Sequence, residues 1–223
     1  MSVILQRVLE PEDLDRVRGE LAALVWKPGK RTAGSTARAV KENLQADGGD
    51  ARTVALERFV LEALRRHPVF ESAARPARIT RLLFSRYLPG MTYGPHTDDA
   101  LMGAGEDRLR TDLAFTVFLA DSNSYEGGEL VVQSPLGEQA VKLEAGDAIV
   151  YPASSIHWVA EVKRGERVAA VGWIESFVAD SAQREILFDL SMLRATLRHN
   201  AADAAALLTL DKSISNLLRM WAR

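Results

Sequence analysis

The spacing of apolar residues predicts two helices in the first third of the chain. Residues 12–26 and 52–66 both carry apolar side chains every three or four positions, which is the spacing of an amphipathic helix. Pro11 stands just ahead of the first segment, where a helix tolerates proline in its first turn. The stretch between them, residues 27–49, is polar and interrupted by glycines, so we expect a loop with one short strand near residues 40–45.

A different pattern begins at residue 79. Short runs rich in β-branched and aromatic residues alternate with Gly, Pro and Asp, as in β-sandwiches and barrels. We therefore predict an α+β protein with a mainly β core, in the form of a double-stranded β-helix, or jelly-roll, barrel. The expected strands cover residues 79–88, 112–119, 129–133, 139–143, 148–151, 157–162 and 167–178.

Helical spacing returns near the C-terminus, with Asp180 or Ser181 as the N-cap of one helix and a last helix over residues 203–221. These helices either pack on the barrel or build a homodimer, and the sequence leaves both open. The expected divisions of the chain are one domain over 1–178, with N-terminal helices in 1–78 and the jelly-roll core in 79–178, and a C-terminal helical extension over 179–223.

Composition narrows the range of partners. The 223 residues are 47% hydrophobic, enough to bury a sizeable core, and the formal net charge is -2. Such a balance gives no global basic field, so we expect neither a nucleic acid nor a membrane as partner. The sequence has no cysteine, which excludes disulfides and leaves His and carboxylates to hold any metal. The first residues lack an apolar leader pattern, so we expect a cytoplasmic protein.

Three residues have the chemistry of a metal site. His96 and Asp98 are two positions apart, so on an extended segment their side chains project to the same side. His157, at the start of another expected strand, is the natural third ligand. Two His and one carboxylate form a facial triad that leaves open positions on an octahedral metal. This is the arrangement of non-haem iron(II) oxygenases, although Mn, Co, Ni and Zn also accept such ligands.

Arg167 is the candidate anchor for an anionic cosubstrate. The turn at residues 163–166 separates it from the strand of His157, so an antiparallel hairpin would bring it back beside the metal. Both faces of its own strand are mostly apolar, which favours burial over a surface position. A buried guanidinium needs an anion, and its planar fork matches a carboxylate bidentately, so a dicarboxylate cosubstrate fits.

Four segments carry a family resemblance that extends over nearly the whole chain. They are similar to the 2-oxoglutarate oxygenases with a prolyl 4-hydroxylase type domain, and within these to the bacterial PKHD-type hydroxylases. The segments are RYLPGMTYGPHTDDA at 86–100, LRTDLAFTVFLADSNSYEGGELVV at 109–132, LEAGDAIVYPASSIHWVAEVKRGERVAAVGWIES at 143–176 and, more weakly, TAGSTARAVKENLQ at 32–45.

This resemblance implies an iron(II)- and 2-oxoglutarate-dependent dioxygenase, a hydroxylase that consumes O2 and releases succinate and carbon dioxide. It implies that His96, Asp98 and His157 hold the iron and that Arg167 binds a carboxylate of 2-oxoglutarate. Tyr87 matches a position where prolyl hydroxylases often place a tyrosine against the same carboxylate. The family also implies L-ascorbate as a reductant and, for bacterial members, a link to iron acquisition.

Two other classes of function use a site of this kind. One is a cupin-like metal-binding or sensing module without turnover, which has no need of a buried carboxylate anchor such as Arg167. The other is a metal-dependent isomerase or hydrolase, in which a metal-bound water acts and neither 2-oxoglutarate nor O2 is consumed. The candidate substrates are a peptidyl proline, a free amino acid or a small metabolite such as a siderophore precursor. Residues 31–45 and 99–110 are the expected substrate contacts, because functional residues concentrate on loops.

Overall fold

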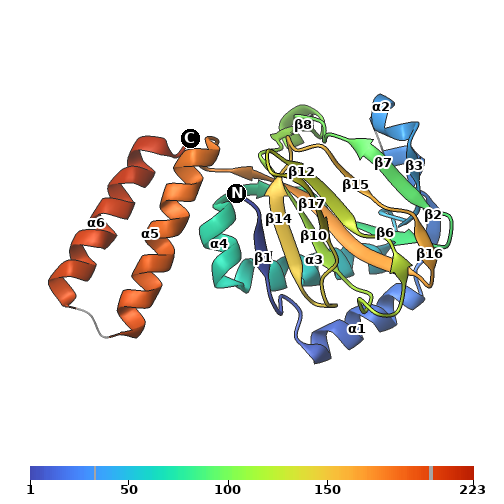
Figure 1. Ribbon diagram of the computed structural model, residues 1–223, viewed down its shortest axis with the longest axis horizontal. Helices are drawn as coiled ribbons and strands as arrows, with labels where there is room; N and C mark the ends of the chain where they lie inside the picture. Colours follow the sequence, from blue (N-terminus) through green and yellow to red (C-terminus); the bar gives the residue numbers. More distant parts are fainter. Residues whose placement is uncertain (33, 201–202) are drawn as a thin grey trace.

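Two facing β-sheets form the body of the protein in the computed structural model, which describes residues 1–32, 34–200 and 203–223 (Figure 1). The 8-stranded sheet has the order β1 (Val3–Leu5), β14 (Ala148–Pro152), β10 (Leu113–Phe118), β17 (Arg167–Ser176), β6 (Leu83–Tyr87), β4 (Leu44–Ala46) and β2 (Trp26–Pro28), with β5 (Pro76–Ile79) also paired to β17. The 5-stranded sheet has the order β13 (Gly137–Val141), β12 (Leu130–Ser134), β15 (His157–Val159), β7 (Thr92–His96) and β3 (Lys41–Glu42).

Two small two-stranded ladders and several helices complete the architecture. The ladders are β11 (Glu126–Gly127) with β16 (Val162–Arg164), and β8 (Leu101–Met102) with β9 (Leu109–Arg110). The helices are α1 (Pro11–Ala22), α2 (Ser35–Arg38), α3 (Ala51–Arg66), α4 (Pro68–Ala74), α5 (Ser181–His199) and α6 (Ala204–Trp221), with 3-10 turns η1 (Gly29–Thr32) and η2 (Gly105–Asp107). No helix in the described ranges is long and apolar enough to cross a membrane.

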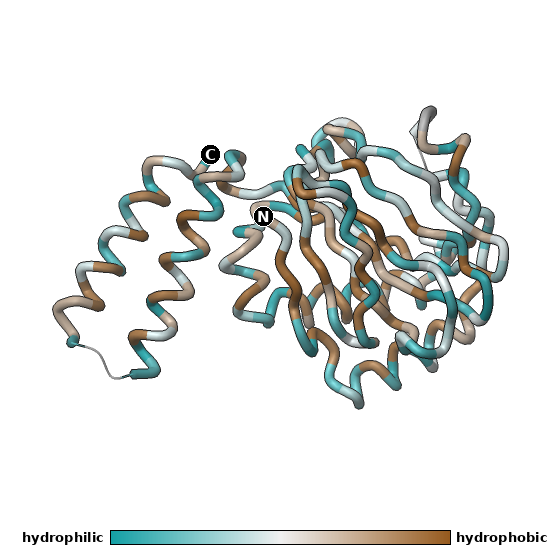
Figure 2. Tube along the Cα trace, in the orientation of Figure 1, coloured by the Kyte–Doolittle hydropathy of each residue, from teal (hydrophilic) through white to brown (hydrophobic). Residues whose placement is uncertain are grey.

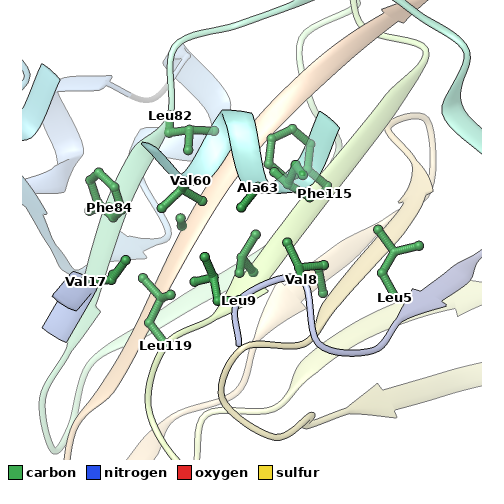
Figure 3. Packing of buried hydrophobic residues seen from close by; sticks show 14 of the residues in the cluster. Leu5, Val8, Leu9, Val17, Val60, Ala63, Leu82, Phe84, Phe115 and Leu119 are labelled. Carbon is green, nitrogen blue, oxygen red and sulfur yellow. The ribbon is translucent and has the colours of Figure 1, made fainter. Parts of the chain in front are cut away.

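Strand β10 shows why the large sheet is buried on both faces. Successive side chains of a strand point to opposite faces. Leu113, Phe115 and Val117 therefore join the core under the helices, whereas Ala114 and Phe118 join a second cluster on the barrel side. Figure 3 shows the first of these clusters, to which Phe115 belongs together with Leu82 and with Val60 and Ala63 of α3. Each such large side chain contributes roughly 1.5–3 kcal/mol by leaving water.

The C-terminal helices form a hairpin beside the barrel (Figure 1). A small apolar cluster around Val178, Leu187 and Ile214 holds α5 and α6 together. Asp180 is the N-cap of α5, one of the two residues predicted for this role, because its carboxylate accepts a hydrogen bond from the Gln183 amide at 2.9 Å. Figure 2 shows further apolar positions along both helices. Leu193 of α5 is half exposed. Dimerisation through these helices, one of the two alternatives that the sequence leaves open, stays a prediction.

The predicted mainly β core flanked by helices is confirmed, but some strand boundaries are wrong, and residues 1–78 also contribute β1, β2 and β4 to the large sheet and β3 to the smaller one. The expected strand 79–88 is divided into β5 and β6, and the expected strand 157–162 is divided into β15 and β16. Strand β7 was not predicted, because Gly94 and Pro95 give it the composition of a turn. Its pairing with β3 and β15 overrides that local signal.

Candidate metal and cosubstrate site

Strand pairing brings the candidate metal ligands together. His96, the last residue of β7, lies directly opposite His157, the first residue of β15, in the antiparallel register. Their ring centroids are 4.4 Å apart. Asp98 follows two residues after β7, and one ligand atom from each of the three residues lies within 4.8 Å of the other two. The structure thus brings together the three residues that the sequence predicted as a triad.

Backbone carbonyls fix the proton position on both imidazoles. His96 Nδ1 is 2.8 Å from the carbonyl oxygen of Gly94, and His157 Nδ1 is 3.0 Å from that of Ser155. A carbonyl only accepts, so each Nδ1 carries a hydrogen and donates it. The lone pair is then on Nε2, the nitrogen left to bind a metal, and a carbonyl partner of this kind is what metal-ligating histidines usually have.

The charges at the triad also fit a cation. Burial, assisted by the nearby His157, lowers the pKa of His96 to about 4, so its imidazole is neutral at physiological pH. Burial raises the pKa of Asp98, and the neighbouring His157 and Trp173 oppose that shift. Asp98 Oδ2 lies 3.8 Å from His157 Nε2 and has no hydrogen-bond partner among the described residues. A buried carboxylate oxygen without a partner is costly, and a divalent cation would remove that cost.

Aromatic side chains hold the two imidazoles in place. The Tyr93 ring stacks on His96 with 3.7 Å between centroids and 18° between planes. Tyr151 meets His157 edge to face at 5.2 Å. Burial raises the pKa of each phenol, so both tyrosines stay protonated. The ligand rings are therefore oriented before any metal binds, which lowers the entropy lost on binding.

Arg167 is buried in the opposite sheet. It is 1% exposed, and it lies directly across from Tyr87 in the antiparallel pair of β17 and β6. Its guanidinium carbon is 5.2 Å from the Tyr87 ring centroid and 5.5 Å from that of Phe118. Its Nε has no hydrogen-bond partner, and no carboxylate of the described residues lies within ion-pair distance. Such a cation is stabilised by an anion that fits beside it.

One cavity connects the triad with Arg167. It has a volume of about 450 Å³, and His96, Asp98, His157, Tyr87 and Arg167 all line it. The predicted hairpin between the strands of His157 and Arg167 is wrong, however, since β15 and β17 belong to different sheets. The chain leaves β15 through β16 and turns at Gly165, whose φ is 76°, before it enters the large sheet. Arg167 therefore approaches the triad across the barrel interior.

Both predicted substrate segments contribute to this cavity. From residues 31–45 the wall includes Thr32, Lys41 and Asn43, and from residues 99–110 it includes Asp99 and Met102. Ala33, which falls in the first segment, lies outside the described residues. The second segment is the β8–β9 hairpin, held by the Thr111 amide on the Ala100 carbonyl. The positions of these segments agree with substrate contact, which remains a prediction.

Sequence reasoning did not single out Lys41 or Asn43. Lys41 is 4% exposed, and burial lowers its pKa to about 8, although the Asp98 charge opposes that shift. The side-chain nitrogen and oxygen of Asn43 are both buried without a hydrogen-bond partner among the described residues. The available signal was the alternation of Lys41, Asn43 and Gln45, because alternate residues of an extended segment share one face.

Comparison with known proteins assigns the family. A sequence model described as the 2OG-Fe(II) oxygenase superfamily matches residues 82–175, and one described as the PKHD-type hydroxylase C-terminal domain matches residues 181–223. A PKHD-type hydroxylase of Maricaulis maris is 49% identical over 222 residues, covering 100% of this chain and 99% of that protein. This chain belongs to the PKHD-type hydroxylase family. A PKHD-type hydroxylase of Hyphomonas neptunium is 44% identical over 221 residues, covering 99% of each chain.

Solved structures support the same fold for this PKHD-type hydroxylase. A prolyl hydroxylase of Trichoplax adhaerens, in complex with a hypoxia inducible factor peptide, matches with a TM-score of 0.60 and 14% identity, covering 78% of this chain and 83% of that one. The non-heme alpha ketoglutarate dependent carbocyclase SnoK matches with a TM-score of 0.55 and 16% identity, covering 78% and 79%. The predicted jelly-roll fold is thus confirmed. Family membership makes the protein an oxidoreductase of the iron(II)- and 2-oxoglutarate-dependent oxygenases.

Proposed function

We propose that this PKHD-type hydroxylase hydroxylates a C–H bond of its substrate, with iron(II) held by His96, Asp98 and His157 and with 2-oxoglutarate anchored by Arg167. The observation that supports this most directly is that one cavity contains both a convergent triad and a buried guanidinium without a counter-ion among the described residues. The triad suits a divalent metal, and the guanidinium suits the distal carboxylate of a dicarboxylate.

The protein side chains orient the reactants. The carbonyls of Gly94 and Ser155 keep Nε2 of both imidazoles unprotonated and ready to bind the metal. Arg167 pairs with the distal carboxylate of 2-oxoglutarate and so points its keto acid end at the triad. The Tyr87 hydroxyl, which stays protonated because burial raises its pKa, donates a hydrogen bond to that carboxylate.

The bound iron and 2-oxoglutarate supply the oxidising power that activates O2, with one oxygen atom entering succinate and the other the hydroxylated product, while carbon dioxide is released. The apolar walls beside Arg167 and the triad, including Ala114 and Leu130, limit water in the cavity. L-Ascorbate as reductant is part of this proposal. The substrate remains one of three candidates: a peptidyl proline, a free amino acid or a small metabolite.

The test is succinate formation from 2-oxoglutarate by protein loaded with iron anaerobically and then exposed to oxygen, with and without ascorbate. We expect iron-dependent succinate in the wild type, none in His157→Ala, and a much higher 2-oxoglutarate requirement in Arg167→Ala. His199→Ala and Arg164→Ala are matched controls, because both residues are exposed and neither lines the cavity.

Two outcomes would contradict the proposal. Loss of succinate in the control variants to the same degree as in His157→Ala would show that the assay reports on folding and not on the site. Failure of the metal-loaded wild type to bind 2-oxoglutarate would remove the role of Arg167. A metal-sensing module or a metal-dependent isomerase or hydrolase would then account better for the triad, although neither agrees with the family.

A further inference from the structure

The cavity has a second buried cation that the proposed reaction does not use. Lys41 of β3, Asn43 between the two strands and Gln45 of β4 are alternate residues of one segment, and all three line the cavity, with exposures of 4%, 5% and 4%. Glu42, between the first two, points away from it and is exposed. This alternation gives the segment one buried polar face, which is unusual for side chains of these types.

Lys41 has few partners for a buried ammonium group. Its Nζ donates a hydrogen bond to Thr32 Oγ1 at 3.1 Å and lies 5.0 Å from the centroid of the Tyr93 ring. No carboxylate in the described part of the chain lies within ion-pair distance of it. An ammonium carries three N–H donors, so this leaves hydrogen-bonding capacity directed into the cavity. A buried charge without a counter-ion is costly, and a ligand anion would offset that cost.

The position of Lys41 separates it from the cosubstrate anchor. Its Cα lies opposite Tyr93 in the pairing of β3 with β7, and Tyr93 in turn stacks on His96. Lys41 therefore belongs to the sheet of the triad, whereas Arg167 belongs to the other sheet. The two cations approach the metal position from different walls of the same cavity.

The charges of the loaded site leave Lys41 unbalanced. The two positive charges of iron(II) and the one of Arg167 match the single charge of Asp98 and the two carboxylates of 2-oxoglutarate. Asp99 also lines the cavity, but it is exposed and hence largely screened by water. One singly charged anion would neutralise the Lys41 ammonium, and a carboxylate is such an anion.

We propose that Lys41 binds a carboxylate of the substrate that is hydroxylated, so that the substrate class is a carboxylic acid small enough to share the cavity with 2-oxoglutarate. This inference rests on the proposed function, because it assumes that 2-oxoglutarate occupies Arg167. Of the three candidate substrates, it favours a free amino acid or another small carboxylic acid over an internal peptidyl residue, which has no carboxylate of its own next to the reacting carbon.

The experiment uses acetate as the probe and acetamide as its neutral counterpart. Full-length protein is loaded with diamagnetic Zn(II) and saturated with 2-oxoglutarate, and binding of each probe is followed by NMR saturation transfer to its methyl group. We expect saturable transfer to acetate and none to acetamide. Lys41→Met should weaken acetate binding by roughly 10- to 100-fold, the effect of a charge-assisted hydrogen bond. Lys41→Arg should retain binding, and Lys163→Met, at an exposed lysine, serves as the matched control.

The outcomes separate this inference from the proposed function. If 2-oxoglutarate binds but acetate gives no transfer, or gives equal transfer in Lys41→Met, the inference is wrong and the proposed function stands. If 2-oxoglutarate does not bind, both fail together. The Lys41→Arg variant keeps the positive charge and so controls for an effect of Lys41→Met on folding. If a well-folded Lys41→Arg loses acetate binding as Lys41→Met does, the proposed role of the charge is also wrong.

Discussion

Arg167 and Tyr87 face each other across neighbouring antiparallel strands, with the guanidinium 5.2 Å from the phenol ring centroid. Neither side chain has a carboxylate partner in the described part of the chain, although both line the cavity. The pair therefore offers a fork of N–H donors and a hydroxyl donor to the same anion.

Removing the Tyr87 hydroxyl should weaken 2-oxoglutarate binding modestly. One neutral hydrogen bond is worth about 0.5–1.5 kcal/mol, so Tyr87→Phe should raise the KM for 2-oxoglutarate by about 2- to 10-fold and leave metal affinity unchanged. A double-mutant cycle with Arg167→Met checks the shared target. The effects should be non-additive if both residues bind one carboxylate, whereas strict additivity would place Tyr87 elsewhere.

A divalent metal should stabilise the protein through the triad. At a metal concentration of about 100 times Kd, binding to the folded state alone adds roughly 2.7 kcal/mol to the free energy of unfolding. This corresponds to a rise in Tm of about 5–10 °C for a domain of this size. Thermal unfolding with Mn(II) should show this rise in the wild type and not in Asp98→Asn. Asp15→Asn, at an exposed position of α1, is the matched control. An equal rise in all three proteins would place the metal away from the triad.

His96 should make the metal-free protein sensitive to acid. Its pKa is about 4 in the folded state against 6.5 when unperturbed, so between these values the unfolded chain binds more protons. The stability contributed by neutral His96 is therefore present above pH 6.5 and is lost as the pH falls toward 4. The raised pKa of Asp98 acts in the opposite direction, so the comparison must be with His96→Gln. Chemical unfolding should show a smaller loss over this pH range in the variant.

Lys41 should cost stability in the absence of ligand. Its pKa of about 8 is below the usual 10.5, so the unfolded chain binds more protons between these values and stability rises with pH across that range. At pH 7 the buried charge destabilises the folded state, so Lys41→Met should stabilise the ligand-free protein by about 1–3 kcal/mol. The gain should shrink near pH 10. Denaturant unfolding at both pH values tests this, and a destabilised variant would instead indicate a structural role.

Two glycines should respond to alanine with opposite signs. A Cβ on Gly172 of β17 would lie 2.6 Å from Phe115 Cζ, so Gly172→Ala should destabilise by roughly 1–3 kcal/mol through overpacking. Gly19, on the exposed face of α1, has nothing within 4 Å of the position that a Cβ would take. Gly19→Ala should therefore stabilise by up to about 1 kcal/mol. Equal effects in denaturant unfolding would contradict the close approach of Phe115 in β10 to Gly172 in β17.

The sequence correctly predicted those features that depend on the residue types within one short segment. The triad and Arg167 could be found because metal-binding and anion-binding side chains are rare in apolar strands. The mostly apolar residues on both faces of β17 likewise predicted burial on both sides, which the structure confirms. What sequence could not supply was the partner of each strand. The assignment of β15 and β17 to different sheets and the existence of β7 depend on long-range pairing, and the buried position of Lys41 follows from the pairing of β3 with β7.

The division of the site between two sheets has a mechanical consequence. The two triad histidines belong to the 5-stranded sheet and Arg167 to the 8-stranded one, so a metal chelated by 2-oxoglutarate would link the two sheets. Separation of the sheets would break this link, either at the triad or at Arg167. Under the proposed function, the two ligands together restrain the opening of the barrel more than either does alone, and each should bind more tightly when the other is present.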